Sequence, residues 1–84
     1  MNLGKHLLLE VYDGTYQQLN DHIFLKDTLF DGIQKSKSTI INCFIKKFDP
    51  QGCTILFALA ESHVSCHTWP EKGCLTADFY TCGD

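Results

Sequence analysis

The sequence predicts an α+β two-layer sandwich, a mainly antiparallel sheet with a helix on one face, in the order β-α-β-β-β-β. Two observations lead to this prediction. Five apolar segments, several of them rich in β-branched and aromatic residues, are separated by short polar turns. One further stretch carries apolar residues at helical spacing. At 84 residues, the chain has the length of one small domain, and we expect residues 1–84 to form it.

The first half of the chain predicts two strands with a helix between them. Residues 5–12 are apolar and end at a turn signal. From about residue 20 to residue 35, leucine, isoleucine and phenylalanine recur near helical spacing, and Asn20 or Asp21 is a suitable N-cap. Residues 39–48 are rich in β-branched and aromatic side chains, which is typical of a strand.

The second half predicts three strands joined by tight turns. We expect strands over residues 53–60, 64–69 and 75–82. Residues 49–52 read DPQG, in which Pro suits the second position of a β-turn and Gly the fourth. Residues 70–73 read PEKG and form a second turn signal. Short turns between successive strands favour antiparallel pairing.

Charge and hydropathy argue against two classes of partner. The net charge is −3, and all seven basic residues are lysines. Arginine provides most bidentate contacts to phosphates and bases, so we expect no nucleic-acid partner. The longest apolar run, residues 53–60, is far shorter than the roughly 20 residues that cross a bilayer as a helix, so we expect no membrane partner.

The cysteines indicate a reducing compartment. The chain has five cysteines, an odd number, with no CxxC pair. Its N-terminal apolar run contains Glu10 and is followed by no small-residue cleavage site, unlike a secretory signal. We therefore expect a cytoplasmic protein with reduced thiols, most of them acting as small buried hydrophobic side chains.

Residues 60–73, with the sequence AESHVSCHTWPEKG, concentrate the reactive side chains. His63, Cys66 and His67 are zinc-type ligands, but alternation along a strand points Cys66 away from the two histidines. A serine or cysteine nucleophile with a histidine base is a second interpretation, although residue types alone do not choose the nucleophile. A third is a polar, solvated strand face.

The run ESHVSCHTWPEKG, followed by ADFYTCGD, resembles the signature of the prokaryotic S-adenosylmethionine decarboxylase proenzymes. The N-terminal GKHLLLEVYD and the turn FDPQG are also similar to that family, at matching spacings. The resemblance therefore extends over nearly the whole chain. A typical member continues for several tens of residues beyond the TCG motif, so we expect a short form that lacks the usual C-terminal part.

The resemblance implies a self-processing enzyme with a pyruvoyl cofactor, and we expect no metal site. The Glu61–Ser62 bond would be cut when Ser62 attacks the carbonyl of Glu61 and β-elimination opens the resulting ester. The products would be a β-chain of residues 1–61 and an α-chain of residues 62–84, which begins with a pyruvoyl group made from Ser62. That ketone forms a Schiff base with the substrate amine and accepts the electrons left by decarboxylation.

The resemblance also implies roles for five other residues. His67 matches a histidine that assists processing, and Thr54 stands where the family often has a processing serine. Cys82 matches the thiol that protonates the product carbon. Phe48 matches an aromatic residue that stacks on adenine, and Glu71 matches a carboxylate that binds the ribose hydroxyls.

The implied substrate is the small molecule S-adenosylmethionine, decarboxylated for spermidine and polyamine synthesis. Because the processing motif makes the cofactor rather than binding the substrate, ornithine or arginine remains an alternative. A non-catalytic partner of a full-length homologue is a further alternative. We also expect the last strand to leave an exposed sheet edge and the chain to form a homodimer or higher oligomer with a shared active site.

Overall fold

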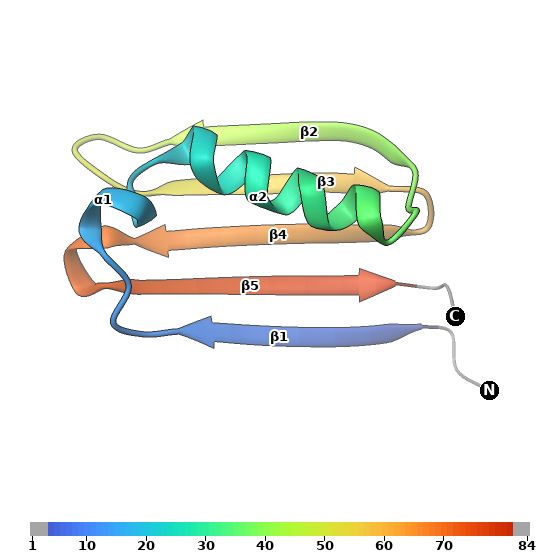
Figure 1. The fold of residues 1–84 in the computed structure, drawn as a ribbon, viewed down its shortest axis with the longest axis horizontal. Coiled ribbons are helices and arrows are strands. Elements are labelled where there is room, and N and C mark those ends of the chain that lie inside the picture. Colours follow the sequence, from blue (N-terminus) through green and yellow to red (C-terminus); the bar gives the residue numbers. More distant parts are fainter. Residues whose placement is uncertain (1–3, 82–84) are drawn as a thin grey trace.

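The computed structural model describes residues 4–81 and confirms the predicted fold class (Figure 1). Within these residues, five strands form one antiparallel sheet in the order β1-β5-β4-β3-β2. The elements are β1 (Lys5–Val11), α1 (Tyr16–Leu19), α2 (His22–Lys35), β2 (Ile40–Lys47), β3 (Cys53–Leu59), β4 (Ser62–Trp69), the short 3-10 helix η1 (Pro70–Lys72) and β5 (Cys74–Thr81).

The expectation that the last strand forms an exposed edge is wrong. β5 lies inside the sheet, between β4 and β1, and the described edges are β1 and β2. The reason is that β1 returns to pair along the whole of β5, from Lys5 opposite Thr81 to Val11 opposite Leu75. As a result, β4 and β5 are flanked on both sides by strands from the first part of the chain (Figure 1).

Local side-chain contacts explain where the helices begin. Asp21 is the N-cap of α2, and its carboxylate accepts a hydrogen bond from the Phe24 N–H at 3.0 Å. The sequence did not predict α1, a single turn capped by Thr15, whose hydroxyl accepts from the Gln18 N–H at 3.2 Å. No helix among residues 4–81 has the length and apolar character needed to cross a membrane.

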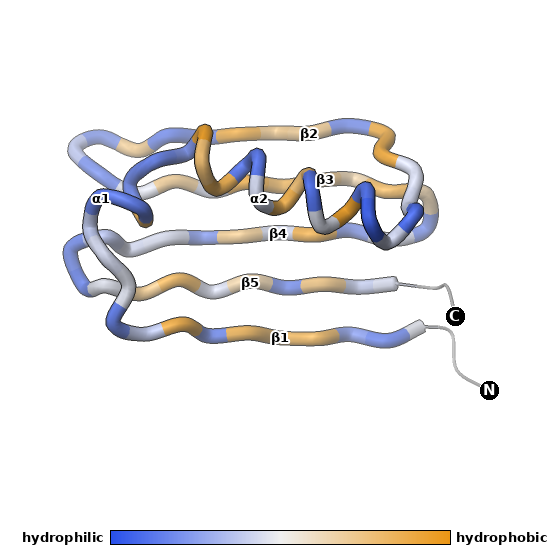
Figure 2. Tube along the Cα trace, viewed as in Figure 1, coloured by the Kyte–Doolittle hydropathy of each residue, from blue (hydrophilic) through white to orange (hydrophobic). Residues whose placement is uncertain are grey.

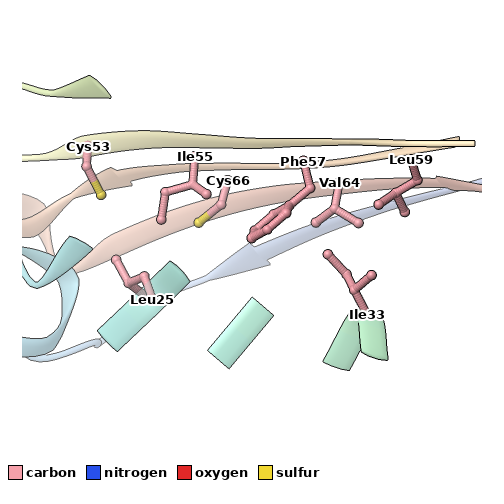
Figure 3. Packing of buried hydrophobic residues seen from close by; sticks show 8 residues of the cluster. All are labelled: Leu25, Ile33, Cys53, Ile55, Phe57, Leu59, Val64 and Cys66. Carbon is pink, nitrogen blue, oxygen red and sulfur yellow. The ribbon is translucent and has the colours of Figure 1, made fainter. Parts of the chain in front are cut away.

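The core lies between α2 and one face of the sheet (Figure 3). Alternate residues of β3 are buried beneath the helix, as strand geometry requires. The helix itself buries only Leu25 and Ile33, whereas Ile23 and Phe30 are 58% and 44% exposed. The apolar face of the helix is therefore narrower than its sequence predicts. The core cluster comprises Leu25, Ile33, Cys53, Ile55, Phe57, Leu59, Val64 and Cys66.

The helix covers only part of the sheet. Figure 2 shows an apolar stretch in β1, at the side of the sheet away from α2. Its residues Leu7 and Leu9 share the helix-side face with Phe79 and Ala77 opposite them, but they are 62% and 44% exposed. The opposite face of the sheet carries no helix in the described part of the chain.

We expect Phe57→Ala to lower the free energy of unfolding by about 3–5 kcal/mol, because a fully buried aromatic ring is replaced by a cavity. Phe57 is 1% exposed at the centre of β3. Its neighbour Leu56 points to the uncovered face and is 39% exposed, so Leu56→Ala is a matched control with a much smaller loss. Urea denaturation of both variants measures the difference, and equal losses would contradict this packing.

Candidate active site

The Glu61–Ser62 bond lies at the tip of the β3–β4 hairpin. Leu59 pairs with Ser62 across the ladder, so Ala60 and Glu61 alone form the turn. Glu61 has a φ of 61°, a left-handed conformation that costs a residue with a Cβ about 1–3 kcal/mol. Glu61 is exposed and Ser62 is half-buried. The bond is therefore accessible, and the residue before it is strained.

Ser62 borders a cavity of about 690 Å³ between the C-terminal half of α2 and strands β4 and β5. Ile33 and Phe79 contribute apolar side chains to its lining, and Ser36 and Ser38 contribute hydroxyl groups. A concave, mainly apolar space with a few polar groups is typical of a site for a small molecule or a docked apolar segment.

Thr54 and His67 form a hydrogen-bonded pair near the other end of the same hairpin. They lie opposite each other on β3 and β4, and Thr54 Oγ1 is 2.9 Å from His67 Nδ1. Both residues are half-buried. Imidazole is the side chain that most often transfers protons in enzymes, and this contact fixes its orientation beside a hydroxyl.

The turn between β2 and β3 holds Phe48 beside this pair. The Phe48 N–H donates to the Gly52 carbonyl, and the Gly52 N–H donates to Asn20 Oδ1, both at 2.9 Å. Gly52 has a φ of 92°, and a Cβ there would lie 2.9 Å from the Thr68 carbonyl oxygen. The turn predicted over residues 49–52 therefore needs glycine at its last position, both for backbone conformation and for space.

A second cavity, of about 330 Å³, brings together four of the predicted site residues, Phe48, Thr54, His67 and Glu71. Phe48 is 45% exposed, and Trp69, which also lines the cavity, is 40% exposed. Glu71 lies in the first turn of η1 and is exposed. An aromatic ring, a carboxylate, a hydroxyl and an imidazole thus share a space at the small end of the range for ligand sites.

The structure separates Ser62 from these four residues. Ser62 and His67 are five positions apart on β4, which corresponds to roughly 16 Å at about 3.3 Å per residue. An odd separation along a strand also directs the two side chains to opposite faces. His67 therefore cannot contact the Ser62 of its own chain in this fold. Cys82, the predicted proton donor, lies outside the described residues.

The described cysteines differ widely in exposure. Cys53 and Cys66 are 2% and 1% exposed, whereas Cys43 is exposed and Cys74 is half-buried, and all four are free thiols. Burial, reinforced by the neighbouring Cys53, raises the pKa of Cys66 to about 12. Cys66 is thus a core side chain rather than a nucleophile.

The three metal-type ligands of the sequence motif do not converge. Cys66 is buried on the helix-covered face of β4, and His63 and His67 lie on the uncovered face, as the alternation predicted. His67 contacts Thr54, whereas His63 contacts Asp78 on β5.

His6, His63 and Asp78 form a cluster that sequence reasoning missed. Asp78 Oδ2 lies 2.8 Å from His6 Nε2, and Asp78 Oδ1 lies 2.6 Å from His63 Nε2. The hydrogen bond from His6 is the main cause that holds the pKa of Asp78 below its usual value. Partial burial of the carboxylate raises this pKa, and the hydrogen bond from His63 lowers it. The carboxylate is therefore ionised at neutral pH and accepts from both rings. His6 and Asp78 are 72 positions apart in the sequence, and the register of β1 with β5 brings them together.

Comparison with known proteins identifies the family. Residues 5–84 match the profile of the S-adenosylmethionine decarboxylase family. The chain belongs to this family. A crystal structure of the adenosylmethionine decarboxylase from Aquifex aeolicus superimposes with a TM-score of 0.90 at 35% sequence identity. The match covers 98% of this chain and 68% of that one, so the described sheet and helix have the fold of the family.

Curated S-adenosylmethionine decarboxylase proenzymes from two groups of organisms are similar to this chain. The proenzyme from Prochlorococcus marinus strain MIT 9313 is 46% identical over 98% of this chain, and that from Brevibacillus brevis is 38% identical over 96%. The chain spans 66% and 61% of the length of these relatives. It therefore spans about two thirds of the length of the relatives it matches.

Proposed function

We propose that this chain is a self-processing, pyruvoyl-dependent decarboxylase that acts on S-adenosylmethionine in polyamine biosynthesis. The observation that carries the proposal is the Glu61–Ser62 bond, placed at a strained, accessible hairpin tip with a serine hydroxyl beside it. The family relationship supports it, because relatives at 38–46% identity are named as proenzymes of that activity.

The hairpin tip fits the formation of a pyruvoyl group from Ser62. Attack of Ser62 Oγ on the Glu61 carbonyl forms an ester bond and breaks the peptide bond, which releases the left-handed conformation of Glu61. Elimination then releases Glu61 as a carboxylate, which separates the chain after residue 61 and leaves dehydroalanine at residue 62. Water hydrolyses the imine tautomer of that residue to the pyruvoyl ketone, and ammonia leaves. Once formed, the pyruvoyl group supplies a ketone that withdraws electrons from the substrate as CO₂ leaves.

A second copy of the chain completes the site in this proposal. The Thr54–His67 pair is too far from Ser62 of its own chain to move a proton there. A two-fold dimer with the β4 strands running in opposite directions would bring each pair to the partner's Ser62, forming two equivalent sites. His67 lies on the open sheet face, whereas Ser62 lies on the helix side at the β3–β4 hairpin tip, so this dimer would need the partner's hairpin tip to reach the open face beside His67.

The second cavity supports a nucleoside substrate. Phe48 presents an exposed ring on which adenine can stack, and Glu71 presents a carboxylate that can accept hydrogen bonds from ribose hydroxyls. Ornithine and arginine have neither an adenine ring to stack on Phe48 nor ribose hydroxyls to bind Glu71. Cys82 remains our expected donor of the proton that the product carbon receives.

Intact mass and CO₂ release from the purified chain together test this function. We expect two fragments divided between Glu61 and Ser62, and release of CO₂ from carboxyl-labelled S-adenosylmethionine. Release of CO₂ only from ornithine or arginine would support the pyruvoyl cofactor but contradict S-adenosylmethionine as the substrate. A chain that stays at 9.5 kDa and releases CO₂ from none of the three would overturn the function and favour a non-catalytic partner of a longer homologue.

A further inference from the structure

The cluster of His6, Asp78 and His63 is unused by the proposed decarboxylase chemistry. Its members come from β1, β5 and β4, three strands that lie side by side in the sheet (Figure 1). Both histidines are register partners of Tyr80, on its two sides, and Asp78 lies two positions before Tyr80 on the same face. One ligand atom from each of the three residues lies within 4.8 Å of the others.

The surrounding contacts hold both imidazole rings in place. The His63 ring is stacked near Tyr80, with centroids 5.9 Å apart and an interplanar angle of 20°. The His6 ring meets Tyr80 edge-on, at 5.9 Å and 83°. Since all three strands belong to one hydrogen-bonded sheet, the donor atoms are positioned before any ligand binds, which reduces the ordering cost of binding.

The donor set has the composition of a transition-metal site. Two imidazole nitrogens and one carboxylate oxygen are common ligands of Zn²⁺, which binds them at about 2.0–2.2 Å. Around such an ion, ligand atoms lie roughly 3.3 Å apart. The two N–O distances here are 2.8 and 2.6 Å, so a small outward rotation of the side chains makes room for an ion.

We propose that His6, His63 and Asp78 form a Zn²⁺ site with three protein ligands and a position open to solvent. The side chains of the three residues are 48%, 40% and 30% exposed, respectively, so an ion can enter and water can complete its coordination. Binding replaces each N–H donor bond to Asp78 by a metal–nitrogen bond, and each neutral ring then carries its proton on Nδ1. No ligand atom belongs to Ser62, so the uncut Ser62→Ala chain keeps all three ligands, although His63 directly follows the proposed cut.

Titration with Co²⁺ and Zn²⁺ tests the site in the full chain. Co²⁺ reports four-coordinate geometry through visible absorption, and Zn²⁺ should displace it. We expect one ion per chain with micromolar or tighter affinity, and the same binding in the uncut Ser62→Ala chain. Loss of one ligand in Asp78→Asn or His6→Gln should weaken binding by more than about 100-fold, since even outer-shell changes cost about 10–100-fold.

Two sets of controls keep the result unambiguous. His22→Gln changes a half-buried histidine on α2, far from the cluster in sequence and on another element, and should bind as the parent does. Circular dichroism will show whether each variant keeps the fold. His6 lies on the edge strand β1, so His6→Gln still tests the site if Asp78→Asn does not fold. Binding that persists in folded His6→Gln, or that is lost only in Cys43→Ser or Cys74→Ser, would overturn the site. Absence of any binding below millimolar concentration would overturn it equally.

Discussion

Ser62→Ala is expected to leave the chain entirely uncut, at its full mass of 9.5 kDa, after any length of incubation. Alanine has no hydroxyl to attack the Glu61 carbonyl, so the ester cannot form and the later elimination cannot occur. Ser62 is half-buried at the start of β4, and its loss removes no core contact described above. The variant should therefore unfold at a denaturant concentration close to that of an uncut parent chain.

Ser65→Ala is the matched control for this experiment. Ser65 lies on the same strand, three positions further on, and is also half-buried. It should be cut at the same bond as the parent, which intact mass measures directly. Cleavage of Ser62→Ala at the parental rate would show that the bond is cut elsewhere or by another agent.

Mixing two inactive chains is expected to restore cleavage. His67→Ala removes the imidazole of the Thr54–His67 pair, and loss of a positioned proton-transfer group slows a reaction by about 10²- to 10⁴-fold. Ser62→Ala removes the nucleophile. In a mixed dimer, the Ser62 of the His67→Ala chain meets the intact His67 of its partner, so one of the two sites is complete.

Co-expression at equal levels tests this arrangement. With random pairing in two-fold dimers, about half of the His67→Ala chains have a Ser62→Ala partner and should be cut. The Ser62→Ala chains should remain whole, which identifies the cut species by mass. If cleavage needed only residues of one chain, neither variant would be cut in the mixture, and the shared site would be wrong. Separate expression of each variant supplies the baseline.

The sequence predicted the fold well because its signals are local. The turn residues 49–52 and 70–73 separate apolar segments whose burial alternates, and the five strands lie close to the predicted ranges. The single turn α1 was missed, since four residues are too few for helical periodicity and its cap, Thr15, is common in other settings. The pairing of β1 with β5 was missed because no local signal specifies a partner so distant in sequence.

The candidate site was predictable only in part for the same reason. The motif around Ser62 and His67 is continuous, so the residues were found, but their separation along β4 appears only when the strand is extended. His6 and Asp78 are 72 positions apart and meet through the register of β1 with β5. A histidine in the first strand carried no indication of that partner.

The position of β4 and β5 in the middle of the sheet has a kinetic consequence for a cut chain. Strands β1 and β3, from the segment before residue 62, hold them on both sides, so two ladders must break before the fragments part. Reassembly would then be a second-order reaction between two fragments, whereas an uncut chain refolds in a concentration-independent step. Maturation would thus make denaturation hard to reverse at low protein concentration, and survival after heating would depend on slow opening of the sheet.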